Sequence, residues 1–243
     1  MKLLTRDMEM NCKKAVLTLC LLCCGMNVSA QFSLGNTGLL NIPTADMQET
    51  GTFMGGANYL PQKMMPFDYD TGNYFVNLTF LSVLELSYRC TLLKRRRTYD
   101  KKLGYYQQDR SVTARVRLLK ERKWYPSVVV GTNDPWKDMG NNYFASVYGV
   151  MTKGISLAKG DRLAFTAGYY VPLNKLCMQE GVFAGISYSP SFCRMIHLMA
   201  EYDSKGFNAG ASARLWKHLS IHIFTREFAC IAGGIRYECT LIH

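Results

Sequence analysis

The chain has 243 residues, of which 48% are hydrophobic and 19% are charged, and its formal net charge is +11. This hydrophobic content excludes a disordered chain, and the length fits one large all-β domain or two small ones. The mean hydropathy of -0.07 also fits a transmembrane β-barrel, whose strands alternate lipid-facing and lumen-facing residues. After residue 30, no stretch approaches the roughly 18 uncharged apolar residues of a spanning helix.

Residues 1–30 have the pattern of a cleaved signal peptide. Lys13 and Lys14 supply the positive region, residues 15–24 supply the apolar region, and Val28-Ser29-Ala30 is a small-residue cleavage site. Cleavage there would make Gln31 the first residue of the mature protein. The cysteines of this region do not follow Gly or Ala, which disfavours lipid attachment.

Residues 31–50 are rich in Gly, Asn, Pro and Thr and lack strand alternation. This composition predicts an ordered but irregular N-terminal segment, either periplasmic or a plug. Its candidate functional residues are Gly38, Pro43 and Thr44. Three roles are open for it: a plug against the lumen, a contact with a periplasmic partner, or a lead into the first strand.

Residues 51–243 are predicted to form one antiparallel transmembrane barrel of about twelve strands. The clearest strand begins at Phe207, where the alternate residues Phe207, Ala209, Ala211, Ala213 and Leu215 are apolar. Only a strand has this period of two. An even number of strands is typical of outer-membrane barrels. The predicted strands are 51–60, 72–80, 83–92, 110–119, 125–133, 142–152, 161–170, 181–189, 195–202, 206–214, 217–225 and 228–238.

The connections between these strands support the barrel, because outer-membrane barrels have short periplasmic turns and longer external loops. Most of the predicted outer loops are longer than every inner turn. The outer loops are 61–71, 93–109, 134–141 and 171–180, and the inner turns are 81–82, 120–124, 153–160 and 190–194. Asp203-Ser204-Lys205, followed by Gly206, predicts a tight hairpin.

Strand parity assigns polar side chains to the lumen and apolar side chains to lipid. An arginine facing lipid at the midplane costs about 2 to 4 kcal/mol, so an inverted strand would be penalised heavily. Tyrosines near strand ends, including Tyr169 and Tyr170, suit an interfacial girdle. The candidate lumen-facing residues are Glu85, Arg89, Arg115, Arg117, Arg162, His197, Glu201, Arg214, His218 and His222.

The sequence offers little catalytic chemistry. His218 and His222 would lie about 13 Å apart on one strand face, too far to share a metal. The five cysteines after residue 30 are odd in number and lack CxxC spacing, which argues against a disulfide framework or a zinc site. No Gly-x-Ser-x-Gly elbow is present. We therefore expect no catalytic residue, metal or cofactor, although a hydrolase assembled from different strands is an open alternative.

The basic cluster at Lys94, Arg95, Arg96 and Arg97, with Lys101 and Lys102, suits an anionic partner. Export disfavours nucleic acid as that partner. A solvated loop is the simplest interpretation, and lipid phosphates or an acidic polysaccharide are the alternatives.

Four short motifs resemble the YjbH family of bacterial outer-membrane proteins. They are residues 38–45 (Gly-Leu-Leu-Asn-Ile-Pro-Thr-Ala), residues 74–78 (Tyr-Phe-Val-Asn-Leu), residues 84–89 (Leu-Glu-Leu-Ser-Tyr-Arg) and residues 201–210 around the hairpin. The resemblance implies an outer-membrane β-barrel connected with exopolysaccharide production or secretion. It implies no catalytic residues.

The sequence therefore predicts a non-enzymatic barrel in the bacterial outer membrane with a role in exopolysaccharide secretion or assembly. An accessory or structural role is favoured over an open pore, because the side chains of a twelve-stranded barrel can fill much of its lumen. The expected partners are outer-membrane lipid, an acidic polysaccharide and periplasmic export proteins. A general porin and a barrel hydrolase are the two alternative functions.

Overall fold

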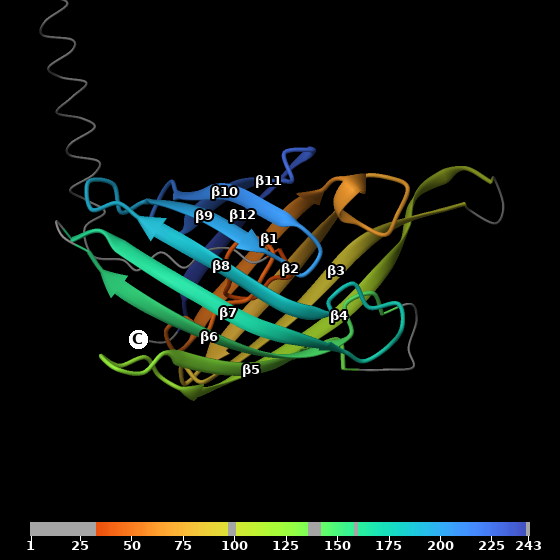
Figure 1. The fold of residues 1–243 in the computed structure, drawn as a ribbon. Helices are drawn as coiled ribbons and strands as arrows, with labels where there is room; N and C mark the ends of the chain where they lie inside the picture. The colour runs from red at the N-terminus through yellow and green to blue at the C-terminus, as the bar shows by residue number, and fades with distance from the viewer. Residues whose placement is uncertain (1–32, 97–100, 136–141, 158–159, 242–243) are drawn as a thin grey trace, which may run out of the picture.

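The computed structural model describes residues 33–96, 101–135, 142–157 and 160–241, so the signal peptide predicted at 1–30 lies outside the described residues. Within those ranges twelve antiparallel strands pair in chain order, and β1 pairs with β12 to close a barrel (Figure 1). The strands are β1 Thr52–Leu60, β2 Thr71–Phe80, β3 Leu84–Arg96, β4 Leu103–Leu119, β5 Ser127–Asn133, β6 Ser146–Ser156, β7 Arg162–Pro172, β8 Gly181–Ser189, β9 Ile196–Tyr202, β10 Phe207–Arg214, β11 Leu219–Arg226 and β12 Cys230–Thr240.

The predicted all-β barrel is thus confirmed, with an even number of strands. The only described helix is a 3-10 turn, Gln62–Met64, in the loop after β1. None of the described helical structure is long and apolar enough to cross a membrane. The predicted hairpin after β9 is also present, and in it the Asp203 carboxylate accepts hydrogen bonds from the backbone N–H groups of Lys205 and Gly206.

The prediction was wrong for the connection 93–109, most of which is strand. Lys94 pairs with Tyr105, Arg95 with Gly104 and Arg96 with Leu103, after a register shift between Leu93 and Lys94. The run of charged residues there does not end the two strands. The backbone ladder continues past the barrel wall as a two-stranded ribbon, since polar side chains are compatible with a strand that is solvated on both faces.

The outer surface of the wall is apolar. Along β11, Ile221 and Ile223 point outward and are exposed, whereas Ser220, His222 and Phe224 point inward and are buried. The same alternation continues around the barrel, as Val112 and Val116 show on β4. This surface suits acyl chains, and closing the sheet removes the unpaired edges that hydrocarbon does not tolerate.

The interior contains an apolar core that the sequence did not indicate. Tyr148, Tyr170 and Phe183 point inward from β6, β7 and β8 and pack with Leu40 and Ile42 of the N-terminal segment. Tyr170 is therefore not a girdle residue as predicted, because it is 1% exposed inside the barrel. Tyr169 precedes it in the same strand and must point to the other face, where it is exposed.

We expect Ile223→Arg to destabilise the barrel by about 2 to 4 kcal/mol, because it places a charge at the middle of the lipid-facing surface. Leu215→Arg, just past the end of β10, is the matched control and should cost about 0 to 1 kcal/mol. Urea unfolding of the two variants in lipid vesicles measures both values. Equal costs for the two substitutions would contradict an apolar belt centred on Ile223.

Candidate functional site

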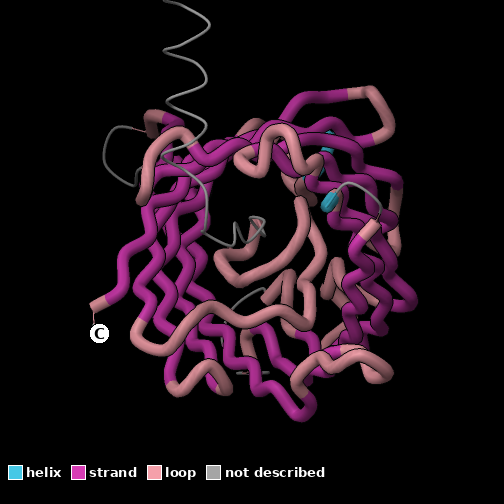
Figure 2. The backbone as a smooth tube through the Cα atoms, turned by 90° about the vertical axis from the view of Figure 1, so that its left-hand side faces the viewer, coloured by secondary structure: helices cyan, strands magenta, loops and turns pink. Residues whose placement is uncertain are grey.

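Residues 33–50, the plug segment, run through the lumen without joining the sheet (Figure 2). An isolated bridge between Gly38 and Pro43 folds the segment back on itself, and the N–H of Leu39 donates to the carbonyl of Ile42 at 2.9 Å. Gly35 has a φ of 89°, and a Cβ there would lie 2.7 Å from the Phe75 ring. Position 35 therefore requires glycine.

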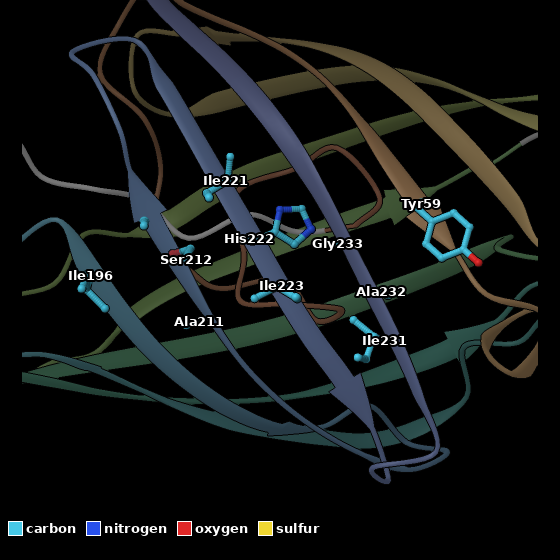
Figure 3. A pocket seen from close by; sticks show the side chains of 11 residues that line it. Tyr59, Ile196, Ala211, Ser212, Ile221, His222, Ile223, Ile231, Ala232 and Gly233 are labelled. Carbon is cyan, nitrogen blue, oxygen red and sulfur yellow. The ribbon is translucent and has the colours of Figure 1, made fainter.

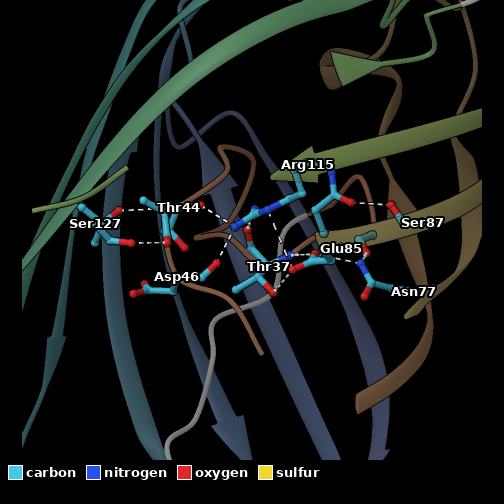
Figure 4. Close-up of polar contacts among 12 residues, drawn as sticks. Thr37, Thr44, Asp46, Asn77, Glu85, Ser87, Arg115 and Ser127 are labelled. Atoms are coloured by element: carbon cyan, nitrogen blue, oxygen red, sulfur yellow. Dashed lines mark hydrogen bonds and ion pairs between the residues drawn. The ribbon is translucent and has the colours of Figure 1, made fainter. Parts of the chain in front are cut away.

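Glu85 on β3 is the first anchor of the plug segment. The backbone N–H of Thr37 donates to Oε1 at 2.8 Å, and its hydroxyl donates to Oε2 at 2.9 Å (Figure 4). Asn77 of β2 donates to Oε1 at 2.8 Å, and Arg115 Nε lies 3.8 Å from Oε2. The Glu85 side chain is fully buried. A buried carboxylate needs such partners, and most of those of Glu85 come from the plug segment and adjacent strands.

Glu201 on β9 is the second anchor, on the opposite arc of the wall. Its carboxylate accepts the backbone N–H groups of Leu40 at 3.0 Å and of Asn41 at 2.7 Å. Asn208 of β10 donates to the same carboxylate at 2.9 Å. The neighbouring Asp203 accepts hydrogen bonds from the side-chain amides of Asn41 and Asn208. Two acidic side chains thus bind the turn of the plug segment.

Arg115 on β4 binds the carbonyl groups of the plug segment. It donates to the carbonyl of Thr37 at 2.6 Å, to that of Thr44 at 2.8 Å and to that of Asp46 (Figure 4). Ala45 is held on both sides, since its N–H donates to the Thr152 hydroxyl and its carbonyl accepts from Ser127. The wall therefore supplies acceptors for the N–H groups of the segment and donors for its carbonyls.

A second charged cluster lies on β10 and β12. Arg214 and Arg236 both form ion pairs with Glu238, the latter at 3.1 Å. The carbonyl of Glu238 lies 2.7 Å from Nδ1 of His218, which directly precedes β11. Glu238 thus offsets part of the positive charge of the two arginines, and none of these contacts involves the plug segment.

The structure does not bring all of the candidate lumen residues together. Glu85, Arg89 and Arg115 are buried on one arc, and Glu201, Arg214 and His222 are buried on another. The others are less enclosed: Arg117, His197 and His218 are half-buried, and Arg162 is exposed. Of the candidate motif residues, Gly38 and Pro43 form the bridge, and the carbonyl of Thr44 is bound by Arg115.

Sequence reasoning missed three residues of this interior. Asn77 completes the Glu85 anchor, and Arg236 and Glu238 form the second charged cluster. All three have the inward parity of their strands, so the period of two could have identified them. Asn208, which has the same inward parity on β10, completes the Glu201 anchor.

A hollow on the outer surface has a volume of about 660 Å³. Small side chains on β10 and β12 leave space between the isoleucines of β9, β11 and β12 (Figure 3). Its exposed lining is almost entirely apolar, which suits acyl chains, whereas Ser212 and His222 are buried behind it. It is therefore part of the lipid-facing surface.

One histidine contacts a serine hydroxyl. Ser189 Oγ lies 2.7 Å from His197 Nδ1 where β8 ends and β9 begins. Among the described residues His197 Nε2 has no hydrogen-bond partner, and Asp161 binds Tyr188 and the Ser191 N–H instead. A Ser-His-Asp triad is thus not assembled there. The described residues also contain no group of three or more His, Cys, Asp or Glu side chains able to hold a metal.

The chain is similar to one protein family and to solved outer membrane proteins. The family model YjbH, described as exopolysaccharide biosynthesis protein YbjH, matches residues 30–171. No curated protein matches the sequence. An outer membrane channel from Pseudomonas putida F1 is similar at 11% identity and a TM-score of 0.42, covering 82% of this chain and 98% of that chain. A Salmonella typhi outer membrane phospholipase is similar at 8% identity and a TM-score of 0.35, covering 78% and 89%.

We expect Glu201→Ala to loosen the turn of the plug segment, because hydrogen bonds to a charged acceptor contribute about 1.5 to 3 kcal/mol each. Amide hydrogen exchange of a peptide covering Leu40 and Asn41 should accelerate by about tenfold or more. Glu180→Ala, in the exposed loop before β8, is the matched control and should leave this exchange unchanged. Unchanged protection in Glu201→Ala would show that the anchor does not hold the segment.

Proposed function

This chain belongs to the YjbH family of exopolysaccharide biosynthesis proteins, and from that premise we propose that it acts in the secretion or assembly of exopolysaccharide at the outer membrane. Its role there is accessory or structural and non-enzymatic. The apolar outer surface of the closed barrel supports the membrane location. The family supports the link to polysaccharide.

The plug segment inside the lumen is the observation that carries the accessory role. A hydrated glycan needs a wide water-filled path, and the plug segment occupies the centre of this barrel (Figure 2). The charged residues that could line such a path, Glu85, Arg115 and Glu201, bind the main chain of the segment instead. In this conformation the barrel is a platform between two aqueous compartments and not a conduit for the polymer.

A general porin is the main competing function, and it requires the plug segment to leave the lumen. We expect the folded protein to be silent in planar bilayers. Glu85→Ala combined with Glu201→Ala should produce measurable ion conductance, because both anchors of the segment are removed. Glu180→Ala is again the control and should remain silent. Steady conductance by the unmodified protein would favour the porin.

The polysaccharide role predicts that cells lacking this protein lose most of their surface glycan under conditions in which the protein is normally expressed. Staining and quantifying extracellular polysaccharide measures this loss, and restoring the gene should reverse it. The variant Ser189→Ala with His197→Ala should restore the glycan equally well, since the role is non-enzymatic. Unchanged glycan in the deletion strain would refute the proposed role, and failure of the Ser-His variant would favour a hydrolase.

A further inference from the structure

The β3–β4 hairpin extends beyond the lipid-facing band of the barrel (Figure 1). Its outermost apolar pair on the lipid-facing side is Tyr88 with Val112, and the next outward residues along β4 are Arg110 and Gln108. Because an arginine in the middle of the bilayer is costly, the change from Val112 to Arg110 marks the edge of the hydrocarbon. The hairpin beyond this point stands in the aqueous region.

An aromatic row, the mouth row, begins on this hairpin and consists of Tyr105, Tyr69, Phe67 and Tyr143. The ring centroids are 6.3 Å apart for Tyr105 and Tyr69, 5.4 Å for Tyr69 and Phe67, and 5.2 Å for Phe67 and Tyr143. The rings come from β4, from the loop between β1 and β2, and from the loop between β5 and β6. The row thus joins three separate parts of the rim.

The mouth row runs from the outer face of the hairpin to the lumen side of the rim. At its outer end Tyr105 pairs with Lys94, which has the strand parity of the outward-facing Tyr88, and the Tyr105 hydroxyl donates to the carbonyl of Asp70. Phe144, next to Tyr143, places its ring 4.1 Å from the guanidinium of the inward-facing Arg89. Leu34 of the plug segment packs against the same Phe144. The end of the row at Tyr143 is therefore folded over the plugged opening. Anything that contacts the row approaches from the aqueous side.

Lys94 contacts the mouth row and belongs to a cationic surface on the hairpin. Its Nζ lies 5.0 Å from the Tyr69 ring centroid and 5.2 Å from that of Tyr105, and its backbone N–H donates to the Tyr69 hydroxyl at 3.0 Å. Beyond it Arg95, Arg96 and Lys101 are exposed. Lys94 and Arg96 share one face of the strand about 7 Å apart, and Arg95 lies on the other face, so the cations are spread over both faces of the hairpin.

One carboxylate beside the row is already engaged in holding the loop between β1 and β2. Asp70 accepts a hydrogen bond from the Gln62 backbone N–H and another from the Tyr59 hydroxyl, both at 2.9 Å. Both hydrogen bonds lower the pKa of the Asp70 carboxyl below its ordinary value, and the bond from Gln62 contributes most. The loop that carries Phe67 and Tyr69 is thereby fixed in place, while the hairpin beyond it remains positively charged.

We propose that the mouth row and the hairpin cations form a binding site for an acidic polysaccharide. Sugar rings offer flat C–H faces that stack on exposed aromatic rings such as Tyr105, which is 45% exposed. Carboxylates along the polymer accept charge-assisted hydrogen bonds from lysine and arginine. Repeated weak contacts with one long polymer add up to useful affinity. The inference rests on the proposed function and names its substrate class.

Lipid phosphates are the alternative partner for the same cations. Lipid headgroups would meet the hairpin close to the edge of the hydrocarbon, at Arg110. Tyr105 lies seven residues beyond Val112 along β4, about 20 Å of strand, whereas the headgroup layer is about 5 to 8 Å thick. This distance from the hydrocarbon favours the polysaccharide.

The test uses the folded full-length protein in detergent micelles and isothermal titration calorimetry with alginate, a polymer of uronic acids. Uncharged dextran is the ligand control. The site variant combines Arg95→Gln, Arg96→Gln and Lys101→Gln. A charge-matched control variant, changed at the opposite end of the barrel, combines Lys120→Gln, Lys123→Gln and Lys217→Gln.

We expect alginate to bind in a manner that weakens with salt, and dextran not to bind. The site variant should bind alginate about tenfold more weakly, whereas the control variant should bind like the parent protein. Tyr105→Ala should weaken binding several-fold and Tyr105→Phe should retain it, which identifies the ring as a contact.

Three results would overturn the site. They are no alginate binding by the parent protein, equal losses in the two charge variants, and competition in which anionic phospholipid vesicles displace alginate. A deletion strain complemented with the site variant separates this inference from the proposed function. If the deletion loses its glycan and the site variant restores it fully, the proposed function stands and the binding site fails.

Discussion

The structure depends on how an irregular peptide is accommodated inside a membrane barrel. A backbone that forms no ladder must find partners for its N–H and C=O groups, since unsatisfied polar groups in a dry interior cost several kcal/mol. The plug segment finds them on the wall. Glu85 and Glu201 accept its N–H groups, and Arg115 donates to its carbonyls. Charges that would be costly alone are stable in the lumen because the segment is there.

The barrel itself could be predicted because strand parity is a local property of the sequence. The apolar face of a strand can be recognised from the residues of that strand alone, as Ile221 and Ile223 show on β11. The hairpin between Lys94 and Tyr105 could not be predicted in this way, because a ribbon solvated on both faces loses the alternation. Tyr170 was misplaced for a related reason, since aromatic residues occur both at the interface and inside a filled lumen.

The anchors of the plug segment were beyond prediction from one sequence. Thr37 is 48 residues from Glu85, and Leu40 is 161 residues from Glu201. No local pattern relates such distant positions, although parity placed both glutamates inside. Both carboxylates bind main-chain N–H groups of the plug segment, and Glu85 also forms an ion pair with Arg115. The lumen therefore contains a folded segment of the chain as well as the side chains that the sequence led us to expect there. The rim then becomes the surface that can meet a polymer.

The positions of the two anchors also matter for how the barrel forms. Glu85 lies on β3 and Glu201 on β9, so the receptor for the N-terminal segment is divided between two arcs. Neither arc binds all of it, and the two arcs face each other across the lumen in the cylinder that the pairing of β1 with β12 closes. A ligand that prefers the finished state stabilises that state. The chain thus carries its own ligand, and docking of this segment favours the closed cylinder.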